Sequence, residues 1–310
     1  MNTTPTTEDR IWSILSHLSA LAFGMGIVLP IVGWSDQRRK SNYASFQCLQ
    51  ALGYQSLGYT VWLLSYLVIA IVASIIVIAM SGTESGRSGS TAATLAPWII
   101  GFVMLGFLAL YLLLPIIAAA ACALGKDFRY PILGNRLARY LGYDPLQESE
   151  EGGWLIEDHE LRWVAAAGHF SVLIMLWGML APLTAWILYG KRSLFLKFQS
   201  MQTLVYQASV TILYFAGTFL YLAGVFALVA SMVGIGQLDR SSSLGIFGMA
   251  VAVVFLLLGG LIILVIPLLH ILGQWAGYRV LKGDNYRYPL VGRLAGKWIS
   301  KGSVSEEKPA

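Results

Sequence analysis

Four long apolar runs without a charged residue constrain this chain more than any other feature. They cover residues 57–80, 98–124, 203–235 and 245–277, and none contains Asp, Glu, Lys or Arg. Because about 20 apolar residues in a helix cross a hydrocarbon core about 30 Å thick, each run can span a membrane. With 57% hydrophobic residues, 12% charged residues and a mean hydropathy of +0.68, the chain is predicted to be an integral membrane protein.

The sequence contains one unit twice. A shift of 152 residues aligns 17–55 with 169–207 without a gap and gives 13 identities in 39 positions. Further along, FRYP at 128–131 returns as YRYP at 286–289. We therefore predict an all-α, polytopic transmembrane helical bundle built from two tandem repeats. Each repeat has a first hydrophobic segment containing Gly and Pro, followed by two long membrane-spanning helices.

Acidic residues mark the connection between the repeats. Residues 144–160 hold seven of the sixteen acidic residues of the chain, so this stretch is too polar to cross a bilayer. We expect a first membrane repeat at 1–143, an acidic linker at 144–160, and a second membrane repeat with a short polar C-terminal tail at 161–310.

The distribution of Lys and Arg predicts how the repeats are oriented. If the first segments, 11–34 and 161–189, dip into the membrane and return, 19 basic residues lie on one side and only Arg87 and Arg240 on the other. A full inversion of the second repeat gives 9 against 12. Because basic residues are retained on the cytoplasmic side, the repeats are expected to share one orientation. The net charge of +5 is therefore explained by topology and anionic lipid, and no nucleic-acid binding is expected.

Two tandem repeats that share one orientation must each cross the membrane an even number of times. This favours a re-entrant hairpin for each first segment. Gly26 and Gly178 are expected to supply the turn, and Pro30 and Pro182 to break the helix just beyond. Length supports the alternative of a single kinked span, because 24 residues are enough to cross once. Four and six spans both remain open at this point.

A polar stripe enters the membrane in each repeat. Gln47, Gln50 and Tyr54 share a helix face by their spacing, and the second repeat has the same stripe. These side chains are expected to bond another helix or the broken hairpin backbone, with a polar groove for a substrate as the alternative. The histidine of each first segment is expected to bond a carbonyl freed near its proline. The candidate polar intramembrane residues are His17, Gln47, Gln50, Tyr54, His169, Gln199, Gln202 and Tyr206.

The repeated aromatic-Arg-Tyr-Pro motif follows the last span of each repeat. Aromatic rings favour the headgroup region, and a long Arg side chain reaches lipid phosphate. Arg129, Tyr130, Arg287 and Tyr288 are therefore the candidate interface anchors.

The sequence lacks the residue patterns of common catalytic sites and metal sites. It has no HExxH motif and no acidic residue within the four apolar runs. It also groups no Ser with His for nucleophilic catalysis, and no set of three or four zinc ligands. We expect a protein that is not an enzyme, with no catalytic residue, no cofactor and no metal site.

The motifs resemble a known family. H-L-S at 17–19, F-x-x-x-QAL at 46–52 and G-x-x-F-R-Y-P at 125–131 are similar to the bacterial Tic-twenty-like membrane domain family of unknown function. Members of that family usually carry one unit, and commonly have His where Gln47 and Gln199 stand here. The resemblance implies a multi-pass protein of a prokaryotic cytoplasmic membrane, with a link to protein transport.

Two functions are expected from these observations. The first is a non-enzymatic scaffold or helper subunit in membrane protein insertion or translocation. The alternative is a small-solute or lipid transporter with its site between the two repeats. A structural protein that binds only lipid and itself fits the same residues. The expected partners are membrane lipids, anionic on the cytoplasmic side, and other membrane proteins.

Overall fold

The computed structural model describes residues 4–83, 89–144, 154–237 and 243–306. Within these ranges the chain forms helices and their connections and no strand, which confirms the predicted all-α class. The helices are α1 (Thr7–Leu18), η1 (Ser19–Ile27), α2 (Val28–Gln37), α3 (Asn42–Thr83), α4 (Gly89–Ala123), α5 (Leu133–Leu141), α6 (Glu157–Phe170), η2 (Ser171–Met179), α7 (Leu180–Tyr189), α8 (Leu194–Gln237), α9 (Ser243–Leu281) and α10 (Val291–Glu306). α6 begins inside the stretch expected as linker.

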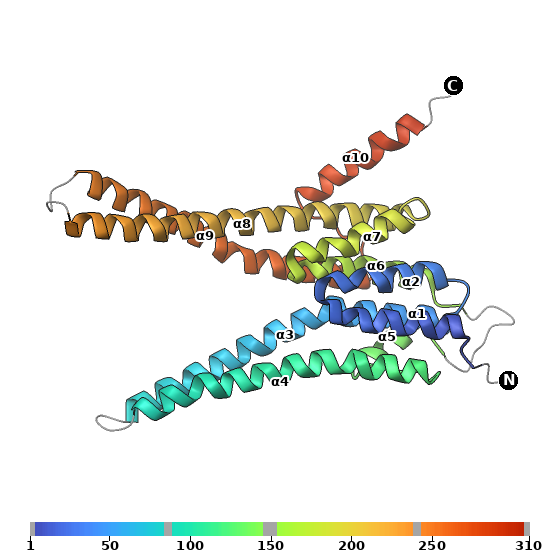
Figure 1. Cartoon of the computed structure of the whole chain (residues 1–310). Coiled ribbons are helices and arrows are strands. Elements are labelled where there is room, and N and C mark those ends of the chain that lie inside the picture. The colour runs from blue at the N-terminus through green and yellow to red at the C-terminus, as the bar shows by residue number, and fades with distance from the viewer. Residues whose placement is uncertain (1–3, 84–88, 145–153, 238–242, 307–310) are drawn as a thin grey trace.

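The first hydrophobic segment of each half is a hairpin. In Figure 1, α1 and α2 lie side by side, and Gly33 of α2 packs against Trp12 and Ser16 of α1. Residues 7–37 and 157–189 are long and apolar enough to cross a membrane by length and composition, but the chain reverses within each. With 12 residues, α1 is about 18 Å long, which is too short to cross a core of about 30 Å. The alternative of a kinked single span is therefore wrong.

The hairpin turns do not use glycine as expected. The backbone reverses at Phe23 (φ 50°, ψ −139°) and at Met175 (φ 52°, ψ −127°), a conformation that is strained for a residue with a side chain. Gly26 and Gly178 serve close approach instead. A Cβ atom would lie 1.7 Å from the Ser19 carbonyl oxygen at Gly26, and 2.0 Å from that of Ser171 at Gly178. Any larger side chain at these positions would force the hairpin open.

The long helices α3 and α4 form one pair and α8 and α9 the other. Both pairs project from the hairpins toward the same end of the molecule (Figure 1), so the prediction of one shared orientation is confirmed. Large apolar side chains point outward along them, with Phe102 of α4 71% exposed and Leu264 of α9 72% exposed. Such a surface is stable against lipid and not against water. The chain is a multi-pass membrane protein.

The two halves meet through their hairpins. α2 packs on α7, η1 packs on η2, and α3 packs on α6. Trp163 of α6 fixes this contact, because its indole N–H donates to the Leu49 carbonyl of α3 at 2.9 Å. Its ring covers Gly53, where a Cβ atom would approach Trp163 to 2.3 Å. The halves therefore form one bundle with a shared core.

Candidate functional site

The predicted polar residues of the first half form one buried hydrogen-bond network. His17 and Gln47 are completely buried, and His17 Nε2 lies 3.0 Å from Gln47 Oε1. The Gln47 amide nitrogen donates to Asp127 and to the Phe128 carbonyl, both at 3.0 Å. Because Gln47 therefore presents its oxygen to the imidazole, Nε2 of a neutral His17 carries the proton. Its Nδ1 then accepts from the Tyr130 hydroxyl at 3.0 Å.

The second glutamine of the stripe clamps the chain that leaves α4. Gln50 Nε2 donates to the Phe128 carbonyl at 3.0 Å, and Gln50 Oε1 accepts from the Tyr130 backbone N–H at 2.9 Å. Tyr54, one turn further along α3, stacks on the Tyr130 ring at 4.1 Å between centroids. The network thus ties three elements together: the hairpin, α3 and the segment after α4. We call this set of residues the first lock.

The second half repeats the arrangement. His169 contacts Gln199 and the Tyr288 hydroxyl at 3.0 Å each, and the Tyr206 and Tyr288 rings stack at 3.9 Å. Gln202 accepts from the Tyr288 backbone N–H at 3.3 Å. These residues form the second lock. Every candidate polar residue predicted from the sequence belongs to one of the two locks.

Two differences between the locks change the groups that form hydrogen bonds. Asn285 stands in the second lock where Asp127 stands in the first, and each accepts from the glutamine amide, at 2.7 Å and 3.0 Å. Burial raises the pKa of Asp127, although its partner Arg129 opposes the shift. In addition, Thr203 places a hydroxyl 3.0 Å from His169 Nδ1, whereas the aligned residue of the first half is Ala51.

The structure corrects two expectations for these residues. Tyr130 and Tyr288 are each only 2% exposed, so they are lock residues and not interface anchors. Burial raises the pKa of both phenols well above the ordinary value, which keeps the hydroxyls protonated as donors. Arg287 is exposed, whereas Arg129 is only partly exposed, at 31%, and pairs with Asp127 at 3.1 Å. The histidines bond Gln and Tyr side chains and not the freed hairpin carbonyls, because another residue already serves those carbonyls.

The residue that bonds the hairpin carbonyls is a glutamine in each half, Gln55 and Gln207, which was not among the site residues predicted from the sequence. Gln55 Nε2 donates to the Ser16 carbonyl at 3.1 Å and to the Ser19 hydroxyl at 2.9 Å. Gln207 makes the equivalent bonds to Gly168 and Ser171, at 2.7 Å and 3.1 Å. A broken helix in lipid needs such partners for its carbonyls. The identity of Gln55 and Gln207 in the repeat alignment was the available signal.

A buried ion pair between the halves was also missed. Arg38 donates through Nε to Glu160 Oε2 at 2.9 Å, and the two side chains are 3% and 2% exposed. Trp34 donates to the other carboxylate oxygen at 3.0 Å, and Tyr189 contacts the guanidinium. No sequence pattern links residues 122 positions apart. Such a pair fixes the relative position of its elements, because either ion alone in this place is strongly unfavourable.

The chemistry open to these groups is limited by their bonding. Both ring nitrogens of His17 and of His169 lie within hydrogen-bond distance of a partner. Among the described residues, no three His, Cys, Asp or Glu side chains gather where they could hold a metal ion. These groups form a buried core held by hydrogen bonds.

Comparison with known proteins places the chain in a family. The sequence profile of the magnetosome magnetite crystal formation protein family (MamF/MmsF) matches residues 8–137 and 160–295, once in each half. No curated protein and no solved structure matches the chain. The resemblance to the Tic-twenty-like family was therefore wrong, and with it the expected role in insertion or translocation. The alternative of a transporter finds no support either. Because the profile covers most of both halves, the chain belongs to the magnetosome magnetite crystal formation protein family.

Proposed function

We propose that this protein is a non-enzymatic component of the magnetosome membrane that supports formation of the magnetite crystal. The observation that carries the proposal is the family match in both halves. The structure adds physical support, because the buried polar side chains of each half are engaged in the locks that hold hairpin and long helices together. A rigid bundle of this kind suits a protein that organises a membrane.

The orientation follows from the charges. The basic turns before α3 and α8 lie at the hairpin end of the molecule (Figure 1). We place this end in the cytosol, against anionic lipid, because basic residues are retained there. The opposite ends of the two helix pairs then face the interior of the vesicle, where the crystal grows. Two helix pairs from one chain present two such ends, which lie apart from each other because the pairs diverge (Figure 1).

Deletion of the gene in a magnetite-forming host tests the role. Electron microscopy of the crystals is expected to show smaller or misshapen particles without the protein, and native protein supplied in trans is expected to restore them. Gly26→Ala should fail to restore them because the new Cβ collides with the hairpin backbone. Gly101→Ala is the matched control, since nothing lies within 4 Å of its Cβ. An unchanged distribution of crystal size and shape after deletion would contradict the proposal.

Labelling of single cysteines tests the orientation. In a background without Cys48 and Cys122, the changes Lys40→Cys and Lys191→Cys probe the hairpin end of each half. Ser90→Cys and Ser243→Cys probe the first turns of α4 and α9. In sealed crystal-bearing vesicles, a membrane-impermeant maleimide should label the first two positions and reach the last two only after permeabilisation. Labelling of one half with the reverse pattern would contradict the placement.

A further inference from the structure

The contact between the two halves joins unlike surfaces. α6 of the second half packs on α3 of the first half, where Trp163 covers Gly53. The counterpart of α6 in the first half is α1, and α1 packs on α2, α3, α4 and η1 of its own half. We call the face of α6 in this contact the presenting surface and the face of α3 the receiving surface. Each half has both surfaces, so one of each remains outside the contact.

The remaining presenting surface lies on α1. The shift of 152 residues that relates the halves places Glu8 at the position of Glu160 and Ile11 at the position of Trp163. Glu160 and Trp163 are only 2% and 7% exposed. In contrast, Glu8 is exposed, Ile11 is 49% exposed, and Leu15 one turn further along is 42% exposed. The positions that the second half buries against its neighbour are therefore open in the first half.

The remaining receiving surface lies on α8. Trp163 packs on Leu49 and Gly53 of α3. The same shift puts Met201 and Val205 of α8 at these two positions. Leu49 is completely buried, whereas Met201 and Val205 are only partly buried. α8 thus leaves open part of the place that Trp163 fills on α3.

The two remaining surfaces carry opposite charges. In the contact between the halves, Arg39 of the basic turn before α3 pairs with Glu157 at 2.8 Å. The corresponding turn before α8 holds Lys191 and Arg192, both exposed, while Glu8 stands on the presenting surface of α1. Opposite charges on two surfaces fix the way in which they meet and disfavour other pairings. The presenting surface of one copy therefore matches the receiving surface of another.

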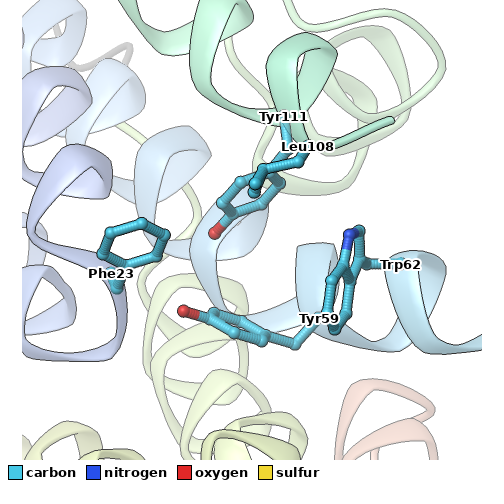
Figure 2. Close-up of a pocket in the computed structure, with 5 residues that line it drawn as sticks. All are labelled: Phe23, Tyr59, Trp62, Leu108 and Tyr111. Carbon is cyan, nitrogen blue, oxygen red and sulfur yellow. The ribbon is translucent and has the colours of Figure 1, made fainter. Parts of the chain in front are cut away.

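These charges distinguish the α1 surface from apolar surface that suits lipid alone. The hollow at the hairpin turn is of the second kind, and Figure 2 shows its uncharged walls: Phe23, Tyr59, Trp62, Leu108 and Tyr111. On α1, the exposed Ile11 and Leu15 lie on the same helix as the exposed Glu8. In the second half, protein and not lipid covers the equivalent positions.

We propose that α1 of one copy docks on α8 of a second copy and on the basic turn before it, so that copies join head to tail in the membrane. Ile11 takes the place of Trp163 in this contact, and Glu8 that of Glu160. Because the two surfaces are unlike, each copy keeps one open for the next, and the assembly is a ring or an open row. The helix pairs of one chain diverge from the contact between its halves (Figure 1), so the same contact between copies does not require their long helices to pack.

Cross-linking of two tagged copies in native membranes tests the proposal. In a background without Cys48 and Cys122, one copy carries Ile11→Cys and the other, with a different tag, carries Val205→Cys. A short bis-maleimide should join the two tags. Phe102→Cys with Leu264→Cys is the matched control, since both native residues point outward on the long helices, and it should give only background product. A yield no higher than in this control would overturn the proposal, as would equal cross-linking of Ile11→Cys to itself, which indicates a two-fold contact.

A charge exchange tests the pairing of the surfaces. Glu8→Lys in the Ile11→Cys copy should lower the yield of the cross-link about two- to fivefold, as for one exposed ion pair. Lys191→Glu with Arg192→Glu in the Val205→Cys copy should restore it. A loss that this exchange does not restore would overturn the proposal. The measurement needs no crystal, so its result is independent of the role in magnetite formation.

Discussion

The locks make a sharp prediction for Tyr130→Phe. The change removes the hydroxyl that donates to His17 Nδ1 at 3.0 Å and keeps the ring that stacks on Tyr54. His17 is 0% exposed and Tyr130 is 2% exposed, so water cannot easily replace the lost donor. Leaving a buried acceptor unsatisfied costs about 1–3 kcal/mol, and side-chain hydrogen bonds in membrane bundles average about 0.6 kcal/mol. We therefore expect a loss of about 1–2 kcal/mol in the free energy of unfolding.

The second lock provides an internal comparison. Tyr288→Phe removes the same hydroxyl from His169, but the Thr203 hydroxyl, which donates to the Gln199 carbonyl at 2.6 Å, lies 3.0 Å from that nitrogen and can rotate to donate to it. The expected loss is therefore smaller, about 1 kcal/mol, because the rotated hydroxyl replaces the lost donor at the cost of its bond to the Gln199 carbonyl. Adding Ala51→Thr to Tyr130→Phe should recover part of the loss in the first half, because it supplies the same hydroxyl there.

Reversible unfolding in mixed micelles measures these differences. Helix content is followed by circular dichroism while a denaturing detergent is titrated, and each variant is compared with the native protein. Equal losses for Tyr130→Phe and Tyr288→Phe would refute the role given to Thr203. A loss indistinguishable from zero for Tyr130→Phe would refute the lock itself.

Three further predictions concern the hairpin, the pH dependence and the interface between the halves. Gly26→Ala should abolish the native fold, since its Cβ would lie 1.7 Å from a carbonyl oxygen, whereas Gly101→Ala should leave the unfolding curve unchanged. Burial raises the pKa of Asp127 above its ordinary value of 3.8, so the folded state binds more protons than the unfolded state between the two values. Native stability should fall as pH rises through that window. The unfolding free energy of Asp127→Asn minus that of the native protein should therefore increase with pH. A difference that falls with pH would show that the carboxylate is stabilised instead. Glu160→Gln should cost about 1–3 kcal/mol, because Arg38 loses one charged partner and keeps Glu157 at 2.9 Å, while Arg38→Met combined with Glu160→Leu should cost less. A double variant less stable than Glu160→Gln in the same detergent titration would contradict this.

Much of the architecture was accessible from the sequence because it depends on composition and periodicity. The runs without charge required a membrane, and the repeat required two similar units. The bias of Lys and Arg predicted their common orientation. The helical spacing of Gln47, Gln50 and Tyr54 predicted a shared polar face, which is where the structure brings them together with His17. These inferences hold because local spacing and solvent partitioning decide them.

The rest depended on contacts between residues far apart in the chain. The reversal at Phe23, the burial of Tyr130 and the pairing of Arg38 with Glu160 follow from how hairpin, long helices and the second half pack together. Sequence spacing assigned Tyr130 to the lipid interface, since an aromatic residue beside Arg after a span has that preference. Only the tertiary structure shows that His17 offers the phenol a buried partner, because a side chain's environment is set by what packs against it.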